Sequence, residues 1–395
     1  MSKKTPQIRF KGFTDDWEER KLGDVVGEIQ SGNRLPKDSL TNGDVPYVVA
    51  QTKNDGVFKK IARETLDYNG NPMKLFPGNS ISFSIDNPEA MFYRNAEFYT
   101  SNIMRVIHED HLTHEQYVFI LENMKRFIRG YDWSRKFSGP VVSNLEYLQP
   151  SEEEQQKIGS FFKQLDKTIA HHQRKLDLLK EQKKGFLQKM FPKNGAKIPE
   201  LRFEGFTGDW EARKLTDVTS SYSGLTYSPT DVQDKGTFVL RSSNVKNDQL
   251  VDADNVYVNP DIVNSNNVKV GDVIVVVRNG SRSLIGKHAI VIKEMPNTVI
   301  GAFMSAFRGQ NGDYINALLS TNNFQKEVHK SLGATINQIT GKDFSMMNFL
   351  TPKLEEQSKI GSFFKQLDET IALHQGKLDL LKEQKKGFLQ KMFVS

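Results

Sequence analysis

The sequence predicts an α+β protein: two mixed α/β domains separated by a long antiparallel pair of α-helices, an intramolecular coiled coil with a pseudo-twofold internal repeat. Three observations predict this fold class. The chain of 395 residues contains one short box twice and one long segment twice. The long segments carry unbroken heptad repeats, and the stretches between the repeats contain the short aliphatic runs typical of strands.

The first repeated element is the short box. Residues 6–25 and 199–218 match at 14 of 20 positions, at an offset of 193. Both copies end in Trp-Glu-x-Arg-Lys-Leu-x-Asp-Val. Self-similarity at a fixed offset indicates a duplicated architecture, so we expect each box to have the same structural role in its own half.

The second repeated element is the long segment. Residues 154–191 and 356–393 match at 34 of 38 positions, at an offset of 202. Alternating steps of four and three connect Ile158 to Met190 and Ile360 to Met392, which is an a/d heptad seam. The seam predicts two helices of roughly 57 Å, at 1.5 Å per residue. The domain boundaries follow: a first domain at 1–153 with its box at 5–25, a helix at 154–191, a second domain at 192–355 with its box at 198–218, and a helix at 356–393.

The ends of the helices carry local signals. Ser151 and Glu154 predict a capping box at the start of the first helix. Thr351 and Pro352 predict a cap followed by proline at the first helical position in the second copy. Pro192 predicts the end of the first helix. Since an apolar seam must be buried, we expect the two helices to pair antiparallel as a spacer, with the two domains at opposite ends.

Polar residues interrupt the seam at equivalent places. His172 and His374 lie near the middle of the helices, and Lys183 and Lys385 lie about three turns further on. A catalytic or metal-binding role for the histidines is one interpretation. The favoured interpretation is that polar seam positions fix the register of the pair.

The segments between the repeats barely resemble each other, yet both show strands followed by a helix. We expect strands at 45–50, 80–85 and 102–107 and a helix at 114–129 in the first. In the second we expect strands at 237–241, 272–278, 287–292 and 300–307 and a helix at 314–330. Residues 78–86 and 271–279 align as equivalent strands that enter a loop. The two segments are therefore predicted to share a fold while their surfaces differ.

The loop at 278–283 is interpreted as a nucleic-acid contact. Arginine can bond guanine edges, asparagine can read adenine, and serine can hold phosphate. The alternative is an ordinary polar hairpin loop. The residues at this loop, at the matching strand exits and at weaker positions form the candidate DNA-binding set: Lys53, Asn54, Lys59, Lys60, Arg94 and Arg105 in the first domain, and Arg241, Ser242, Asn244, Lys246, Arg278, Asn279, Ser281, Arg282 and Lys287 in the second.

Composition limits the function classes. The chain has no cysteine, which excludes disulfides, Cys-ligated metals and thiol catalysis and fits a reducing cytoplasm. The net charge is +6, but residues 26–153 hold 14 basic and 17 acidic residues and residues 219–355 hold 13 and 12. Because neither segment is strongly basic, DNA binding requires clustered basic groups or a second subunit that grips phosphate.

Enzymatic motifs are not found. No phosphate-binding loop or glycine-rich cofactor loop occurs, and 280–288 has the wrong spacing. His108, His111 and His114 could form a metal cluster, but a solvated turn before a helix is the favoured interpretation. No purely aliphatic run approaches the ~20 residues of a membrane helix. The sequence therefore favours a non-catalytic protein that binds no membrane.

At this point the residues resemble a known family. The boxes at Trp17–Val25 and Trp210–Val218, and the two Glu-Gln-x-x-Ile-Gly-x-Phe-Phe-x-x-Leu-Asp helices, look like the specificity subunit of type I restriction–modification enzymes, which act in host defence. The resemblance covers essentially the whole chain, including the order of the segments.

This resemblance implies a role for each part. Each domain would be a target recognition domain that reads one half of a bipartite, asymmetric double-stranded DNA site. The helix pair would set the gap and dock two modification (methyltransferase) subunits, which carry S-adenosylmethionine and methylate adenine at N6. Two restriction (translocase–nuclease) subunits, which use ATP and Mg²⁺, would join them, and the specificity subunit would hold no cofactor and no catalytic residue. The alternative function is a protein–protein adaptor built on the coiled coil.

Overall fold

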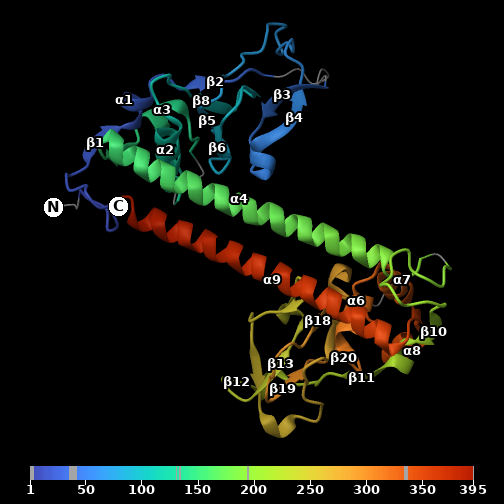
Figure 1. The fold of residues 1–395 in the computed structure, drawn as a ribbon. Helices are drawn as coiled ribbons and strands as arrows, with labels where there is room; N and C mark the ends of the chain where they lie inside the picture. The colour runs from blue at the N-terminus through green and yellow to red at the C-terminus, as the bar shows by residue number, and fades with distance from the viewer. Residues whose placement is uncertain are drawn as a thin grey trace. The chain divides into compact units, whose positions relative to one another are not determined.

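The computed structural model describes residues 4–34, 42–129, 131–132, 135–193, 195–332 and 337–394. Contacts divide the chain into two compact units, Met1–Gln173 with Gly376–Ser395 (unit 1) and Arg174–Gln375 (unit 2). The division falls inside the long helices α4 (Glu152–Lys189) and α9 (Leu354–Lys391), so each unit contains part of both (Figure 1). No helix among the described residues is both long and apolar enough to cross a lipid bilayer.

Unit 1 combines two small sheets with short helices. One sheet has the order β2-β8-β5-β6 and is antiparallel, and the other has the order β4-β3-β7, with β3 and β7 parallel. A separate ribbon pairs β1 with β9. The elements are β1 (Glu18–Lys21), α1 (Leu22–Val26), β2 (Gln30–Ser31), β3 (Asn42–Val48), η1 (Lys53–Gly56), β4 (Val57–Ile61), β5 (Ser80–Ser84), β6 (Met91–Arg94), β7 (Tyr99–Thr100), β8 (Met104–Ile107), α2 (His114–Phe127), α3 (Gly139–Ser143) and β9 (Glu146–Gln149).

Unit 2 repeats this plan with additional short elements. Its sheets have the orders β11-β20-β17-β18 and β12-β16-β13-β19, with β13 and β19 parallel, and its ribbon pairs β10 with β21. The elements are β10 (Glu211–Lys214), α5 (Leu215–Val218), β11 (Thr219–Ser223), η2 (Pro229–Asp231), β12 (Val232–Gln233), β13 (Thr237–Leu240), η3 (Ser242–Asn244), β14 (Val245–Lys246), β15 (Gln249–Leu250), β16 (Val256–Val258), η4 (Pro260–Ile262), β17 (Val273–Val276), η5 (Arg282–Leu284), β18 (His288–Ile290), β19 (Thr298–Ile300), β20 (Met304–Gly309), α6 (Gly312–Leu319), α7 (Asn322–Ser331), α8 (Gly341–Met346) and β21 (Asn348–Thr351).

Equivalent backbone hydrogen bonds show that the two units share one fold. Ile85 N donates to Ile103 O, and Val277 N donates to Phe303 O at the same place in unit 2. These bonds align residue 85 with residue 277, an offset of 192. The expected alignment of 78–86 with 271–279 is therefore wrong by one residue, and Asn87 rather than Asp86 corresponds to Asn279.

Two expected elements of unit 2 are divided. The predicted strand at 300–307 is β19 followed by β20, because the chain turns at 301–303 and its halves join different sheets. The predicted helix at 314–330 is α6 followed by α7, because Thr321 begins a new helix and its hydroxyl accepts from Phe324 N at 3.3 Å. Periodicity alone did not reveal either break.

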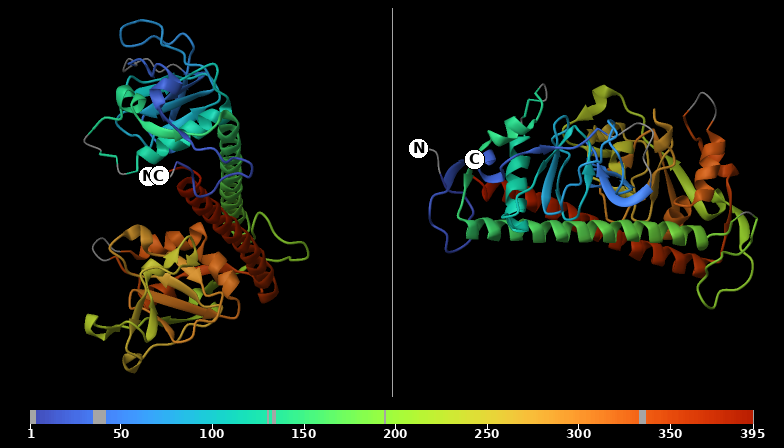
Figure 2. Two further views of the ribbon diagram at one scale, coloured as in Figure 1. Left: turned by 90° about the vertical axis from the view of Figure 1, so that its left-hand side faces the viewer. Right: turned by 90° about the horizontal axis from the view of Figure 1, so that it is seen from above.

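The long helices pack against each other within both units, and Figure 2 shows both helices from two further sides. In unit 1 the rings of Phe161 and Phe388 lie 4.9 Å apart, and in unit 2 those of Phe186 and Phe363 lie 5.0 Å apart. These pairs are exchanged by the 202-residue offset. In each unit the start of one helix meets the end of the other, and the seam positions are buried or half-buried.

The caps differ from expectation in part. Ser151 Oγ accepts from Glu154 N at 3.4 Å, as a cap requires. The Glu154 carboxylate does not complete a capping box, because it binds Arg9 Nε and Nη2 at 2.7 and 2.8 Å. Thr351 belongs to β21 and Pro352 precedes α9 by two residues, so the expected cap there is wrong. The second box nevertheless repeats the ion pair: Arg202 binds Glu356 at 2.7 Å.

In each unit, the domain packs closely against a long helix at a glycine of that helix. A Cβ on Gly159 would lie 1.9 Å from Glu115 O at the start of α2. The equivalent Gly361 has Tyr314 N of α6 within 2.7 Å of the same position. Glycine in a helix is unfavourable by about 1 kcal/mol relative to alanine, so its presence in both copies indicates that this contact sets how closely each domain packs on its helix.

Candidate nucleic-acid interface

In unit 2, three strand exits lie together at one edge. They are η3 after β13, the loop 277–286 after β17 and the turn 301–303 between β19 and β20. Asn279 Nδ2 donates to Ser242 Oγ at 3.2 Å, which joins the first two. The Arg278 guanidinium lies 4.9 Å from the centre of the Phe303 ring, which joins the third. Polar and aromatic groups from distant parts of the chain thus form one surface.

The loop after β17 is held in a defined shape. Ser281 N donates to Asn279 Oδ1 at 3.0 Å, as in an Asx turn. Arg282 Nε donates to Asn337 Oδ1 at 2.9 Å, and the hydroxyls of Ser281 and Ser283 lie 2.9 Å apart. An ordered loop presents its donors at lower entropic cost than a mobile one, which suits a surface that discriminates between bases.

A cleft of about 670 Å³ adjoins this edge. Its lining includes Tyr227, Arg241, Asp254 and Phe303. Phe303 was not among the expected site residues, although it is 52% exposed. Phe303 lies within the strand expected at 300–307, where an aromatic residue is no signal of exposure, so only the chain turn at 301–303 reveals it.

Unit 1 has the same junction with different chemistry. Asn87 Nδ2 donates to Ala50 O at 3.5 Å, where unit 2 has Asn279 and Ser242. The neighbouring η1 turn carries Lys53 and Asn54, both exposed, and Asn54 adopts a left-handed φ of 52°. Lys60 is exposed on β4 and Lys59 is half-buried beside it. The expected lysines therefore lie on the turn and strand that follow the first exit.

Four expected contacts have structural roles. Arg94 is buried, donates to Ser82 Oγ and Asp55 O, and has its pKa lowered by burial to about 10. Asn244 is fully buried and donates to Ala253 O at 2.7 Å.

The other two of these four residues, Arg241 and Arg105, donate to nearby acceptors. Arg241 is bonded to both the carbonyl and the carboxylate of Asp254 at 2.6 Å. Arg105 donates to the carbonyls of Asn102 and Met104 at 2.9 and 2.8 Å. All four side chains support the loops, and we do not place them among the proposed base contacts.

Two expected lysines lie elsewhere. Lys246 is exposed on β14, in the β14–β15 hairpin. Lys287 lines a cleft of about 510 Å³ together with Lys180, Lys183 and Lys184 of α4. Since these two residues are not part of the Arg278 edge, they are candidates for phosphate contacts only.

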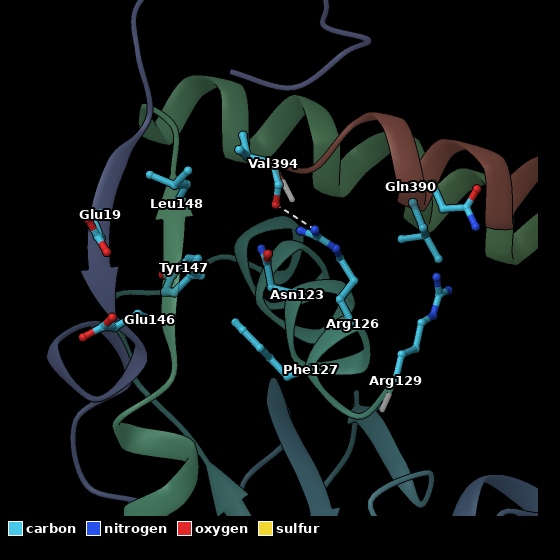
Figure 3. A pocket seen from close by; sticks show the side chains of 11 residues that line it. Glu19, Asn123, Arg126, Phe127, Arg129, Glu146, Tyr147, Leu148, Gln390 and Val394 are labelled. Carbon is cyan, nitrogen blue, oxygen red and sulfur yellow. Dashed lines mark hydrogen bonds between the residues drawn. The ribbon is translucent and has the colours of Figure 1, made fainter. Parts of the chain in front are cut away.

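The histidines at 108–114 and a pocket beside the end of α9 are further features of unit 1. Within the described ranges, no group of three or more His, Asp or Glu residues could hold a metal ion. His108 bonds Asn79 O, and His114 stacks on Tyr93 with 4.0 Å between ring centres. A pocket of about 480 Å³ in unit 1 mixes Arg126 and Arg129 with Glu19 and Glu146 (Figure 3).

A hydrogen bond at that pocket ties the domain to the end of a long helix, and unit 2 has a counterpart. Arg126 Nη2 donates to Val394 O at 2.7 Å (Figure 3), and in unit 2 Asn323 Nδ2 donates to Pro192 O at 2.9 Å. Val394 and Pro192 are equivalent under the 202-residue offset. Arg126 therefore has a fold-supporting partner at the end of α9.

Comparisons with known proteins match both halves. A family model described as the type I restriction modification DNA specificity domain matches residues 14–181 and 207–383. The chain is 22% identical to the type I restriction enzyme MjaVIII specificity subunit of Methanocaldococcus jannaschii, over 95% of this chain and 91% of that protein. It is 27% identical to the StySPI specificity subunit of Salmonella potsdam, over 45% and 40% of the two chains.

Solved structures show the same fold. The S subunit of a type I restriction–modification system from M. genitalium superposes with a TM-score of 0.71 at 13% identity, over 99% of both chains. A chain from a study of complex assembly and conformational transition of the type I system gives a TM-score of 0.50 at 17% identity, over 95% and 97%. At these identities the likeness concerns the fold.

Proposed function

The chain belongs to the type I restriction–modification DNA specificity family and is a non-catalytic subunit that recognises DNA, and on that premise we propose that each unit reads one half of a bipartite, asymmetric target. One observation carries the proposal. Two units of the same fold stand on nearly identical frames, yet their equivalent strand exits present different side chains. Different readers on a repeated frame suit a target with two unlike halves.

In unit 2 the proposed base contacts are Arg278 and Arg282, with Ser242 and Ser281 as phosphate or base contacts. Asn279, whose amide is bonded to Ser242 and Ser281, is proposed to order the loop that presents them. Arginine is the side chain that pairs bidentately with guanine in the major groove. In unit 1 the proposed contacts are Lys53, Asn54, Lys59 and Lys60. Lys246 and Lys287 are proposed phosphate contacts, since phosphate supplies affinity without sequence information.

The experiment measures binding of the complex with its modification subunits to duplexes altered in either half. Arg278→Ala and Arg282→Ala should each cost roughly 1–3 kcal/mol and relax discrimination only in the half read by unit 2. The control is Lys269→Ala, an exposed lysine at the opposite end of β17. Equal losses at both halves, or none at either, contradict the assignment, and absence of any sequence preference supports the adaptor function instead.

We further propose that α4 and α9 form a spacer that sets the gap between the half-sites. Seven residues added to each helix, after Gln173 and after Gln375, preserve the heptad and lengthen the pair by about 10.5 Å, at 1.5 Å per residue. That length corresponds to about three base pairs at 3.4 Å each. The preferred gap should lengthen accordingly while each half-site preference stays. An unchanged gap would exclude the spacer role.

The remaining parts of the assembly are proposed from the family. Two modification subunits would dock on the helices and bring S-adenosylmethionine for adenine N6 methylation. Two restriction subunits would bring ATP- and Mg²⁺-dependent translocation and cleavage. The complex would act in the cytoplasm. Mass spectrometry of the intact assembly measures the stoichiometry, and methylation by the purified chain alone would contradict the division of labour.

A further inference from the structure

Each long helix carries one seam lysine that is withdrawn from solvent. Lys183 is buried, and the Lys385 side chain is 16% exposed. Both bind an aspartate of the other helix: Lys183 Nζ lies 2.7 Å from Asp368, and Lys385 Nζ lies 2.8 Å from Asp166. The 202-residue offset exchanges the two pairs, so they belong to the constant frame.

A third charged group joins each pair, and it comes from the variable part of the unit. In unit 1, Glu122 in the middle of α2 lies 2.9 Å from Lys385. In unit 2, Asp248 in the turn between β14 and β15 lies 3.5 Å from Lys183. A helix supplies the carboxylate in one case and a hairpin turn in the other. Two unrelated elements thus deliver the same chemical group to the same point of the frame.

The turn that carries Asp248 favours glycine at that position. Asn247 and Asp248 both adopt left-handed φ values, 53° and 59°, as the two central residues of a type I′ turn do. Asn-Gly is the preferred pair in this turn. Aspartate also occurs in this turn, but glycine at position 248 would adopt the backbone at lower cost, so turn chemistry does not require an aspartate there.

We propose that Lys183 and Lys385 are the points at which the constant helices hold dissimilar recognition units, each unit supplying its own carboxylate from whichever element reaches the lysine. A buried ammonium is stable only with partners of opposite charge and good geometry, so the contact favours one orientation of the unit on its helices. The idea that these units read DNA rests on the proposed function, whereas the contact itself does not. Any unit carried by this frame then needs a carboxylate here.

The two contacts differ in strength. Glu122 is 1% exposed and also binds Lys125 at 3.0 Å, whereas Asp248 is 49% exposed and its contact is longer. Exposed ion pairs contribute little, and breaking a buried pair costs more because it strands a charge. Unit 1 is accordingly held more firmly at this point than unit 2.

The first experiment is a double-mutant cycle in the full chain, read by hydrogen exchange of peptides within each unit. Glu122→Gln and Lys385→Met should each lower protection of unit 1 more than tenfold. The double variant should be protected at least fivefold better than the product of the two single losses predicts. Lys183→Met is the matched control, since it removes the equivalent lysine of unit 2. Its effect should be independent of Glu122→Gln. Additive effects at positions 122 and 385 would overturn the proposal.

The second experiment uses the turn and remains informative if the buried variants fail to fold. Turn chemistry alone predicts that Asp248→Gly raises the protection of unit 2. The proposal predicts that Asp248→Asn, which keeps a residue suited to the turn, lowers it about twofold and does not add to Lys183→Met. It also predicts that Asp248→Gly raises protection more in the Lys183→Met variant than in the original chain. An equal rise for Asp248→Gly with and without Lys183→Met, or no loss for Asp248→Asn, would overturn the proposal.

A functional readout separates this idea from the DNA-binding proposal. With modification subunits present, Glu122→Gln should widen the range of tolerated gaps between half-sites at least twofold, without altering the bases preferred in either half. Unaltered gap tolerance would refute the orienting role. If the chain without substitutions shows no sequence preference, DNA reading is refuted, while the results of the mutant cycles still stand.

Discussion

Substitution of Arg9 by methionine tests how the short box holds the start of α4. The Arg9 guanidinium makes two bonds to Glu154, whose carboxylate is fully buried and also accepts from Trp17 Nε1 at 3.2 Å. These bonds raise the pKa of Arg9. Methionine keeps the packing of the stem but leaves the carboxylate with the indole N–H as its remaining side-chain donor.

The magnitude follows from the burial of Glu154. Breaking a buried ion pair by removing one partner costs roughly 3–5 kcal/mol. Because 1.4 kcal/mol is a factor of ten, hydrogen-exchange protection of peptides from 4–26 and 146–165 should fall by about two to three and a half powers of ten. Peptides of unit 2 should not change, since the variant leaves the second box intact.

The chain provides both a control and a replicate. Arg20 binds Glu18 at 2.7 Å in the same box, but both side chains are more than half exposed, so Arg20→Met should cost under about 1 kcal/mol. Arg202→Met should reproduce the large loss in unit 2, where Arg202 binds the buried Glu356. Similar effects of Arg9→Met and Arg20→Met would refute the anchoring role of the buried pair.

The remaining predictions concern packing and pH. Gly159→Ala should weaken the contact of α2 with α4. Gly185→Ala, whose Cβ meets no atom within 4 Å, should stabilise the chain by about 0.4–1 kcal/mol. Hydrogen exchange measures both variants, and a change of stability in the same direction for both would contradict the close-approach argument. Burial tends to raise the pKa of Glu122, but Lys125 and Lys385 outweigh it and lower that pKa. Its stabilisation is therefore present above the usual carboxyl pKa of about 4.3 and is lost as pH falls through the lower folded value. Glu122→Gln should flatten this acid dependence of unit 1 protection, and an unchanged profile would assign it to other groups.

Local sequence patterns predicted much of the architecture. The a/d period from Ile158 to Met190 placed the long helices to within two residues, because the period of an α-helix repeats within the segment itself. The strands at 80–85 and 237–241 were also predicted, because a run of β-branched and aromatic residues is a signal carried by adjacent positions. The break at Thr321 was missed because a polar pair inside an otherwise helical pattern carries a weak signal.

The candidate site was predicted less completely. Arg278, Asn279 and Arg282 were predicted from the residue types of their loop, and their contact with DNA stays a prediction. Asn244 appeared equivalent to them in sequence, but three backbone and side-chain acceptors surround its amide within the folded unit. Whether a polar side chain faces solvent or supports a loop depends on residues that are distant along the chain.

The sequence by itself determined the duplication, the two long helices and the order of elements in each half, because repeats and short periodicities can be read from the order of residues along the chain. Tertiary structure decided which groups meet. Glu154 binds Arg9 across 145 positions, and Lys385 binds Glu122 across 263. Such pairings arise only when the packing of helices and sheets brings separate segments together, and no local pattern along the chain encodes which carboxylate will reach which cation.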